Sequence, residues 1–198
     1  MKSLLALLLT LLSVSAVQAQ ERRVHAYVMQ STSMEPTLRV GERVMADRGP
    51  DDCGDVEGVV TGDIVVRRRG SDHWISRVVA GPGQTVELRA GLLVVAGRET
   101  LQTETGRVLL GGYGGRVFRE EPGEGKHHHI FLRDGPAPDS ILNYGPVRLG
   151  PDQWFLLGDN RLNAIDSRED GPVASADICG VLTHLFLSTD PSRVGPLR

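Results

Sequence analysis

The chain has 198 residues, of which 40% are apolar and 24% are charged, so it can bury a core and is not disordered over its whole length. Its 22 basic and 25 acidic residues leave a formal net charge of −3, which excludes a field strong enough to capture nucleic acid. The 24 glycines and 11 prolines, without long helical periodicity, favour a mostly β chain with many turns.

The beginning of the chain predicts export. Residues 3–17 are mainly apolar, and Val17 and Ala19 put small residues at the two positions that a secretory cleavage site uses. The apolar core of this stretch is shorter than the roughly 20 residues that a helix needs to cross a bilayer. We therefore expect residues 1–19 to be a cleaved signal peptide, with a short membrane anchor as the alternative, and residues 20–188 to form one domain.

Short apolar or alternating runs, separated by Gly, Pro, Asp and Asn clusters, predict seven strands. They cover residues 42–47, 63–67, 74–80, 85–89, 92–96, 128–132 and 153–157. So many short strands favour antiparallel sheets that close or sandwich to hide their edges.

Two further segments differ from these runs. Residues 99–125 are glycine-rich and charged, which predicts a long hairpin excursion or a surface loop, and the whole excursion extends over about 99–150. The tail, residues 189–198, contains two prolines and no periodicity, so we expect it to be frayed.

Cys53 and Cys179 are the only cysteines. An even count in an exported protein permits one disulfide, whereas the apolar run around Cys179 equally fits a buried core residue, and both interpretations stay open. Two cysteines so far apart in the sequence do not by themselves predict a zinc site. Of the three consecutive histidines, only His127 and His129 would share one face of a strand. We expect no metal and no cofactor.

The chemistry begins in the segment Ser-Thr-Ser-Met-Glu-Pro-Thr-Leu, residues 31–38. A proline three positions after Ser33 suits a nucleophile on a rigid turn, because Pro36 fixes its own φ and restricts the residue before it. Three more segments follow in order: GDIVV at 62–66, ISRVVAGPG at 75–83 and GDNRLNAIDSR at 158–168.

Together the four segments resemble the successive sequence boxes of type I signal peptidases, a family of serine endopeptidases, over residues 24–188. The resemblance implies an antiparallel β fold with a catalytic core and an inserted β-ribbon excursion. In that family a lysine, kept neutral by an apolar site, takes the proton from the serine that attacks the scissile carbonyl. The resemblance implies that Ser33 is the nucleophile and that the Ser31 hydroxyl joins the Ser33 N–H in stabilising the oxyanion.

The resemblance also implies a substrate-binding wall. An extended peptide would be added as a strand, with its small side chains entering shallow pockets. Gln30 stands at a position that we expect to be apolar or proline. The matching positions are Met29, Gln30, Met34 and Leu38 near the nucleophile, and Trp74 and Ile75 on the facing strand.

The chain departs from the family at the base. The residue before Arg77 should be lysine, or histidine in the related reticulum-type enzymes, but it is Ser76, whose hydroxyl has no useful basicity near pH 7. Ala164 stands where the family commonly has a serine that hydrogen-bonds that lysine. His73 would face away from Ser76 on a regular strand, and only a bulge at residues 71–72 would redirect it as a replacement base. The other basic side chains considered, which have no spacing argument in their favour, are His25, His184 and Lys126.

Two pairs of opposite charge would support the site from beneath. The resemblance implies that they pair and hold the boxes together, a role that is structural more often than catalytic. These residues are Arg77, Asp159, Asp166 and Arg168.

The implied function is cleavage of signal peptides from exported pre-proteins after small-x-small sequences. The alternative is a catalytically impaired relative that binds extended or signal-peptide segments without efficient cleavage, and a third interpretation is an exported β domain with a structural role. The expected partners are pre-proteins or extended peptides and the membrane surface, not nucleic acid. The expected location is the periplasm or the outer face of the cytoplasmic membrane.

Overall fold

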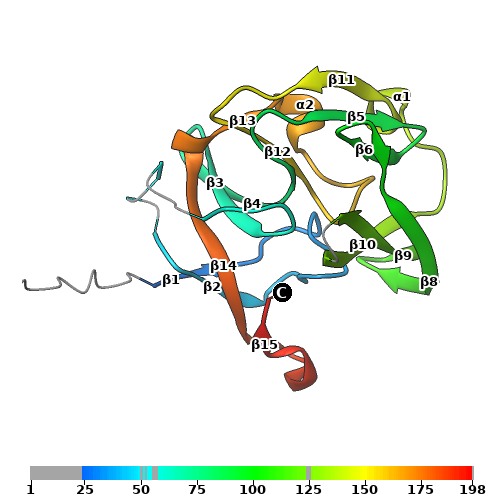
Figure 1. Cartoon of the computed structure of the whole chain (residues 1–198). Helices are drawn as coiled ribbons and strands as arrows, with labels where there is room; N and C mark the ends of the chain where they lie inside the picture. Colours follow the sequence, from blue (N-terminus) through cyan, green and yellow to red (C-terminus); the bar gives the residue numbers. More distant parts are fainter. Residues whose placement is uncertain (1–23, 50, 52, 55–57, 124–125, 198) are drawn as a thin grey trace, which may run out of the picture.

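The computed structural model describes residues 24–49, 51, 53–54, 58–123 and 126–197 (Figure 1). The expected signal peptide, residues 1–19, lies outside this part. Within it, no helix is both long and apolar enough to span a membrane. The described chain is mostly β and its named strands pair antiparallel, which confirms the predicted fold class.

The largest sheet carries the nucleophile region at one of its edges. β14 lies between β2 and β3, so the C-terminal half of the chain completes a sheet begun by the N-terminal half. The strand order is β1 (His25–Val28), β2 (Arg43–Ala46), β14 (Ile178–Leu187), β3 (Ile64–Arg69), β4 (Asp72–Ala80), β12 (Gln153–Leu157) and β13 (Val173–Ala174), with β15 (Gly195–Pro196) paired to β14.

Two smaller sheets complete the fold. In Figure 1, β5, β6 and β11 lie along the top, whereas β8, β9 and β10 stand at one side of the molecule. The four-stranded sheet contains β11 (Tyr144–Arg148), β5 (Thr85–Arg89), β6 (Leu92–Val95) and β7 (Arg98–Glu99), and the three-stranded sheet contains β10 (Lys126–Arg133), β9 (Tyr113–Gly123) and β8 (Leu101–Leu110). Two short α-helices, α1 (Asp139–Leu142) and α2 (Ser167–Asp170), lie between strands in the described part.

All seven predicted strands are present, as β2, β3, β4, β5, β6, β10 and β12, and β5 and β12 have the predicted bounds. Within residues 99–125, for which a hairpin and a loop were both open, Leu101–Leu110 and Tyr113–Gly123 pair as the hairpin strands β8 and β9. β14 was not among the predicted strands, although it joins the two halves of the main sheet.

The first core cluster lies beneath the segment that joins β1 to β2. This cluster removes one face of the main sheet from water. Such burial of apolar side chains is the dominant stabilising contribution in a β fold of this kind. The members include Met29, Met34, Leu38, Val44, Ile64, Val66, Cys179 and Leu182.

The tail differs from the expectation that it is frayed. Residues 191–193 form a 3-10 turn and β15 pairs with β14. Arg193 explains the order, because its Nε donates to Glu42 Oε1 over 2.6 Å and its guanidinium also donates to the carbonyl of Thr37 over 2.9 Å. The tail therefore lies against the segment that follows the predicted nucleophile.

Cys53 and Cys179 form a disulfide, which settles the two interpretations left open by the sequence. Cys179 is also fully buried in the first core cluster, so both descriptions of this residue apply at once. The bond ties the segment between β2 and β3 to the start of β14 across 126 residues of sequence.

Candidate active site

The predicted nucleophile lies on the turn between β1 and β2. Met34 and Leu38 are fully buried in the first core cluster and anchor this turn, whereas Ser33 is half-buried and Ser31 is exposed. The two serine hydroxyl oxygens are 3.0 Å apart, within hydrogen-bond distance, and the Ser33 N–H points at the Ser31 oxygen over 3.5 Å. The turn thus presents two hydroxyls and one backbone N–H together.

The loop after β12 holds this turn from the other side. The Asn160 N–H donates to the Ser33 carbonyl over 2.9 Å, and the Asn160 side-chain amide donates to the Thr32 carbonyl over 3.1 Å. The Asn163 amide donates to the Thr32 hydroxyl over 2.6 Å. Both carbonyls of the turn are therefore satisfied, which fixes the backbone around Ser33.

Gly158 marks the closest approach between the loop and the turn. A Cβ at this position would lie 2.7 Å from the Ser33 carbonyl oxygen and 2.3 Å from the Ala164 Cβ. Leu157 pairs with Arg77 in the β4–β12 ladder, so the next residue, Gly158, is level with Ser76. The structure thus gathers Ser33, Ser76 and Ala164 around one glycine.

Ser76 is buried on β4 opposite Val65. Among the described residues, its hydroxyl makes no hydrogen bond, and the only side chain bonded to the Ser33 hydroxyl is that of Ser31. No described lysine or histidine therefore contacts the nucleophile through a hydrogen bond.

The candidate replacement bases lie elsewhere. The β3–β4 register runs unbroken from Ile64 opposite Arg77 to Arg69 opposite Asp72, so the bulge that would redirect His73 is absent from this hairpin. The ring of His73 instead lies beside the disulfide. Lys126 donates to the Thr61 carbonyl over 3.0 Å, the His25 ring lies against the Tyr27 ring at a tilt of 54°, and His184 is exposed on β14.

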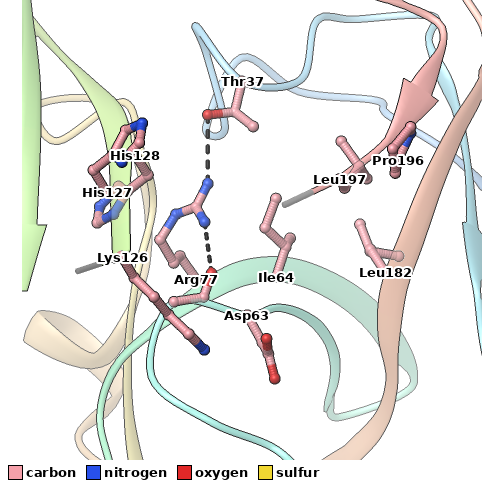
Figure 2. Close-up of a pocket in the computed structure, with 11 residues that line it drawn as sticks. Thr37, Asp63, Ile64, Arg77, Lys126, His127, His128, Leu182, Pro196 and Leu197 are labelled. Carbon is pink, nitrogen blue, oxygen red and sulfur yellow. Dashed lines mark hydrogen bonds between the residues drawn. The ribbon is translucent and has the colours of Figure 1, made fainter. Parts of the chain in front are cut away.

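Arg77 and Asp159 form a buried ion pair beneath the turn. Two guanidinium nitrogens of Arg77 each lie 2.7 Å from a carboxylate oxygen of Asp159. Arg77 also donates to the Gly62 carbonyl over 2.7 Å and to the Thr37 hydroxyl over 3.5 Å, the two bonds drawn in Figure 2. The Thr37 hydroxyl in turn donates to Asp159 over 2.5 Å. Burial alone would raise the pKa of Asp159, but the Arg77 charge and hydrogen bonds outweigh it and hold that pKa below its ordinary value.

Asp166 and Arg168 also pair, but within a single box rather than between boxes. Two nitrogens of Arg168 lie 2.8 and 2.7 Å from the Asp166 carboxylate. The same carboxylate accepts hydrogen bonds from the Gly158 N–H over 2.9 Å and from the backbone N–H of Arg168, in the first turn of α2, over 3.2 Å. This pair therefore shapes the loop that reaches Ser33, while the Arg77–Asp159 pair joins the loop to β4.

The predicted substrate-binding residues lie on both faces of β4 and do not form one wall. Ile75 packs against the core cluster that contains Met29, Met34 and Leu38, so the structure brings these four side chains together. Trp74 is on the other face of β4, the face of Ser76, with the Arg69 guanidinium 4.5 Å above its ring. Gln30 is exposed beside the buried Met29.

A buried charged group that the sequence does not predict links the three-stranded sheet to the loop after β12. Glu120 of β9 is fully buried and pairs with Arg161, whose Nε donates to the Gly158 carbonyl over 3.2 Å. His128 Nε2 lies 3.2 Å from Glu120. Burial would raise the pKa of Glu120, but the charge of Arg161 lowers it far below its ordinary value. No local signal predicts this pair, because 41 residues separate its members.

Glu35 is a second buried carboxyl group that the sequence does not predict. It is buried in the nucleophile turn, and its Oε2 has no hydrogen-bond partner among the described residues. A Cβ at Gly111, in the hairpin between β8 and β9, would lie 3.3 Å from this oxygen and 3.2 Å from the Thr32 methyl group. Burial raises the pKa of Glu35, against the opposing charge of Arg39. The tip of the three-stranded sheet therefore rests on the turn.

Sequence comparisons with known proteins agree on one family. The sequence profile described as "Signal peptidase, peptidase S26" matches residues 1–187. Signal peptidase I P of Bacillus subtilis subsp. natto is 31% identical over 176 residues, covering 84% of this chain and 79% of that protein. A Staphylococcus aureus protein named Inactive signal peptidase IA is 26% identical over 179 residues, covering 90% of this chain and 87% of that protein. The crystal structure of a signal peptidase I from Enterococcus faecalis is similar at 21% identity, with a TM-score of 0.41 over 65% of this chain and 99% of that one.

Proposed function

Because this chain belongs to the signal peptidase S26 family, we propose that it is a serine endopeptidase that cleaves signal peptides from exported pre-proteins after small-x-small sequences. The observation that carries the proposal is the pair of hydroxyls of Ser31 and Ser33, 3.0 Å apart, on a turn anchored by buried residues. The loop around Gly158 fixes the backbone of that turn. A preorganised turn of this kind is what nucleophilic attack requires.

The proposed reaction begins with attack by the Ser33 oxygen on the scissile carbonyl. A covalent acyl-enzyme forms, the new N-terminus of the mature protein leaves, and water then releases the signal peptide. The Ser33 N–H and the Ser31 hydroxyl converge and would stabilise the oxyanion in both steps. One such donor typically contributes about 3–4 kcal/mol to the transition state.

Removal of the proton from the Ser33 hydroxyl is the step for which the chain lacks the base of the family. Ser76 occupies the position of the family lysine, and Ala164 occupies the position of the serine that would orient that lysine. General-base assistance typically accelerates a reaction by about 100-fold to 10,000-fold. We therefore expect cleavage that is slower by about that factor than in a member of the family with the lysine present.

The substrate would lie between the turn and β4 as an added strand. Ile75, which packs on the buried Met29 and Met34, supplies an apolar wall for small side chains, and the exposed Gln30 would lie at its rim. We propose that the protein acts outside the cytoplasm, in the periplasm or at the outer face of the cytoplasmic membrane, with residues 1–19 as a signal peptide or short anchor.

A second candidate function rests on the same missing base. A relative that binds extended segments without efficient cleavage needs the wall and the turn but not the lysine. Ser76 and Ala164 favour this candidate, because a hydroxyl that orients a lysine has no task once the lysine is absent. The two candidates differ in one measurable property, which is turnover that depends on Ser33.

The test incubates the full chain with a pre-protein that carries a small-x-small site. Slow cleavage by the wild type that is lost in Ser33→Ala and retained in Ser71→Ala, an exposed serine in the β3–β4 turn, supports the endopeptidase. Equal cleavage by the wild type and Ser33→Ala would end that idea. Binding of the substrate by all three proteins without any cleavage would identify the non-cleaving binder instead.

A further inference from the structure

A second cluster of reactive side chains lies away from the nucleophile turn. Cys53 comes from the segment between β2 and β3, His73 from the start of β4, and Cys179 from the start of β14. The two sulfur atoms and one ring nitrogen of His73 all lie within 4.8 Å of one another. The two cysteines are joined as a disulfide and are the only ones in the chain.

The strand register explains why the three side chains meet. His73 pairs with Arg68 on β3, which puts its side chain on the same face of β4 as Ile75. That face packs against the first core cluster, to which Cys179 belongs. Cys53 is held nearby because the N–H of Gly54 donates to the Ile178 carbonyl over 2.8 Å.

The position of the cluster makes it accessible from one side. Cys179 is fully buried, Cys53 is half-buried and His73 is exposed. An ion or a reducing thiol can therefore approach from the side of His73, while the core side remains dry. Burial of one sulfur beneath an exposed imidazole is a suitable environment for a strong metal–thiolate bond.

The ligand set is of the kind that zinc prefers. Two thiolates and one imidazole form the set of some catalytic zinc sites, in which the fourth position stays open for water. Thiolate and imidazole ligands select zinc and similar thiophilic ions over magnesium or calcium. Disulfide sulfurs are not thiolates, so the oxidised protein cannot offer this set.

We propose that Cys53, Cys179 and His73 form a redox-gated site for a thiophilic divalent cation of the zinc class. A dithiol reductant gives two electrons to the Cys53–Cys179 bond, its own two sulfurs become a disulfide, and the protein gains two thiols. The cation then binds both sulfurs and the neutral imidazole, and the two thiol protons pass to water. A disulfide-bearing oxidant then accepts two electrons from the thiolates and becomes a dithiol, which releases the cation and restores the protein disulfide.

The geometry needs only local adjustment. Zinc lies about 2.3 Å from sulfur and about 2.0 Å from nitrogen, so tetrahedral ligand atoms are about 3.5–3.8 Å apart. The three atoms already fall within 4.8 Å, so His73 has to move by about an ångström at most and the two sulfurs have to separate by side-chain rotation. Cys53 and Gly54 lie in a turn and not in a named strand, so no ladder at these two residues resists this change.

The experiment titrates Co²⁺, a spectroscopic substitute for Zn²⁺, into the full chain with and without prior reduction by a dithiol that is then removed. The expected result is one equivalent of Co²⁺ bound by the reduced protein, with thiolate-to-cobalt absorption, and none of that absorption in the oxidised protein. Because the chain has no other cysteine, the absorption reports this site alone, even if His127 and His129 bind cobalt weakly.

Three variants complete the design. Cys53→Ser should abolish the absorption, and His73→Ala should weaken Co²⁺ binding at least about tenfold and change the visible bands. His184→Ala, an exposed histidine on β14, should behave like the wild type. Reduced protein that binds no Co²⁺, binding that is unchanged in His73→Ala, or a circular dichroism spectrum showing that reduction unfolds the chain would each overturn the proposal.

Discussion

Gly158 is the residue on which the geometry of the nucleophile turn depends most directly. Because its Cβ would lie 2.7 Å from the Ser33 carbonyl and 2.3 Å from Ala164, Gly158→Ala should push the loop away from the turn. We expect a loss of about 1–3 kcal/mol in the free energy of unfolding, as for other overpacked sites, together with loss of Ser33-dependent cleavage. Chemical denaturation and the cleavage assay measure the two effects.

The matched control is Gly106→Ala in β8, where nothing lies within 4 Å of the added Cβ. It should change both quantities little. A Gly158→Ala protein that is as stable as the wild type would contradict the close approach.

Ser76 and Ala164 carry the second prediction at this scale. Both lie around Gly158 next to the turn, so Ser76→Lys combined with Ala164→Ser should rebuild the lysine and its hydrogen-bonding partner. The expected gain in cleavage of a pre-protein is about 100-fold to 10,000-fold, the usual contribution of a general base. Ser33→Ala in the same background should remove the gain. No gain over the wild type would mean that the region around Ser33 no longer accepts the family mechanism.

Single residues were predicted well where a motif carried them and poorly where contact across the fold created the site. The sequence predicts the pairing of Arg77 with Asp159, because both stand in boxes of a known family. It also predicts that the His73 side chain lies on the face of its strand opposite Ser76, because strand alternation is strict. It could not predict the burial of Glu120 or Glu35. Both carboxylates stand in polar stretches, and only the closure of the three-stranded sheet onto the turn and its loop buries them.

At the scale of elements, the three-stranded sheet depends on a few buried contacts because β8 is exposed along almost its whole length. The ion pair of Glu120 with Arg161 is its charged link to the loop after β12. Glu120→Gln should therefore leave Arg161 buried without its counter-charge, and removing one partner of such a pair typically costs about 3–5 kcal/mol. We expect amide hydrogen exchange in β9 and β10 to be faster in Glu120→Gln than in the wild type.

The control for this variant is Glu104→Gln, because Glu104 is exposed and lies 3.8 Å from Arg116 on the same sheet. Exposed pairs contribute about 0–1 kcal/mol, so exchange should stay close to that of the wild type. Equal exchange in the two variants would show that Glu120 does not hold the sheet in place.

The same distinction explains which strands were predictable. β5 and β12 alternate or are continuously apolar, so their bounds follow from the pattern alone. β8 has polar residues on both faces and few buried side chains, so no period is visible in its sequence. β14 pairs with three different strands over its length, and its mixture of buried and exposed residues follows those neighbours rather than one simple alternation.

For the whole molecule, the paired carboxylates determine how stability changes with pH. Burial alone would raise the pKa values of Glu42, Glu120, Asp159 and Asp170, but hydrogen bonds and opposite charges outweigh it and lower these pKa values in the folded state, whereas burial raises the pKa of Glu35. A carboxylate with a lowered folded-state pKa contributes stability above its unfolded pKa, about 4, and loses it as the pH falls through the folded-state value. Four groups of this sign outnumber Glu35, so the free energy of unfolding should be highest near neutral pH and fall steeply below about pH 4.

Chemical denaturation at pH 7, 5 and 3 measures this decline, and Asp159→Asn tests the contribution of the buried Arg77–Asp159 pair. The variant loses the charge that Arg77 requires, so it should be about 3–5 kcal/mol less stable than the wild type at pH 7. Because it has no carboxylate to protonate at this position, its stability should fall less between pH 5 and pH 3, and the two curves should approach each other in acid. Parallel curves would mean that Asp159 has the same pKa in the folded and unfolded chains, and the buried pair would then not be a source of acid lability. Asp177→Asn, which breaks the exposed pair of Asp177 with Arg68, should leave the curve near that of the wild type at every pH.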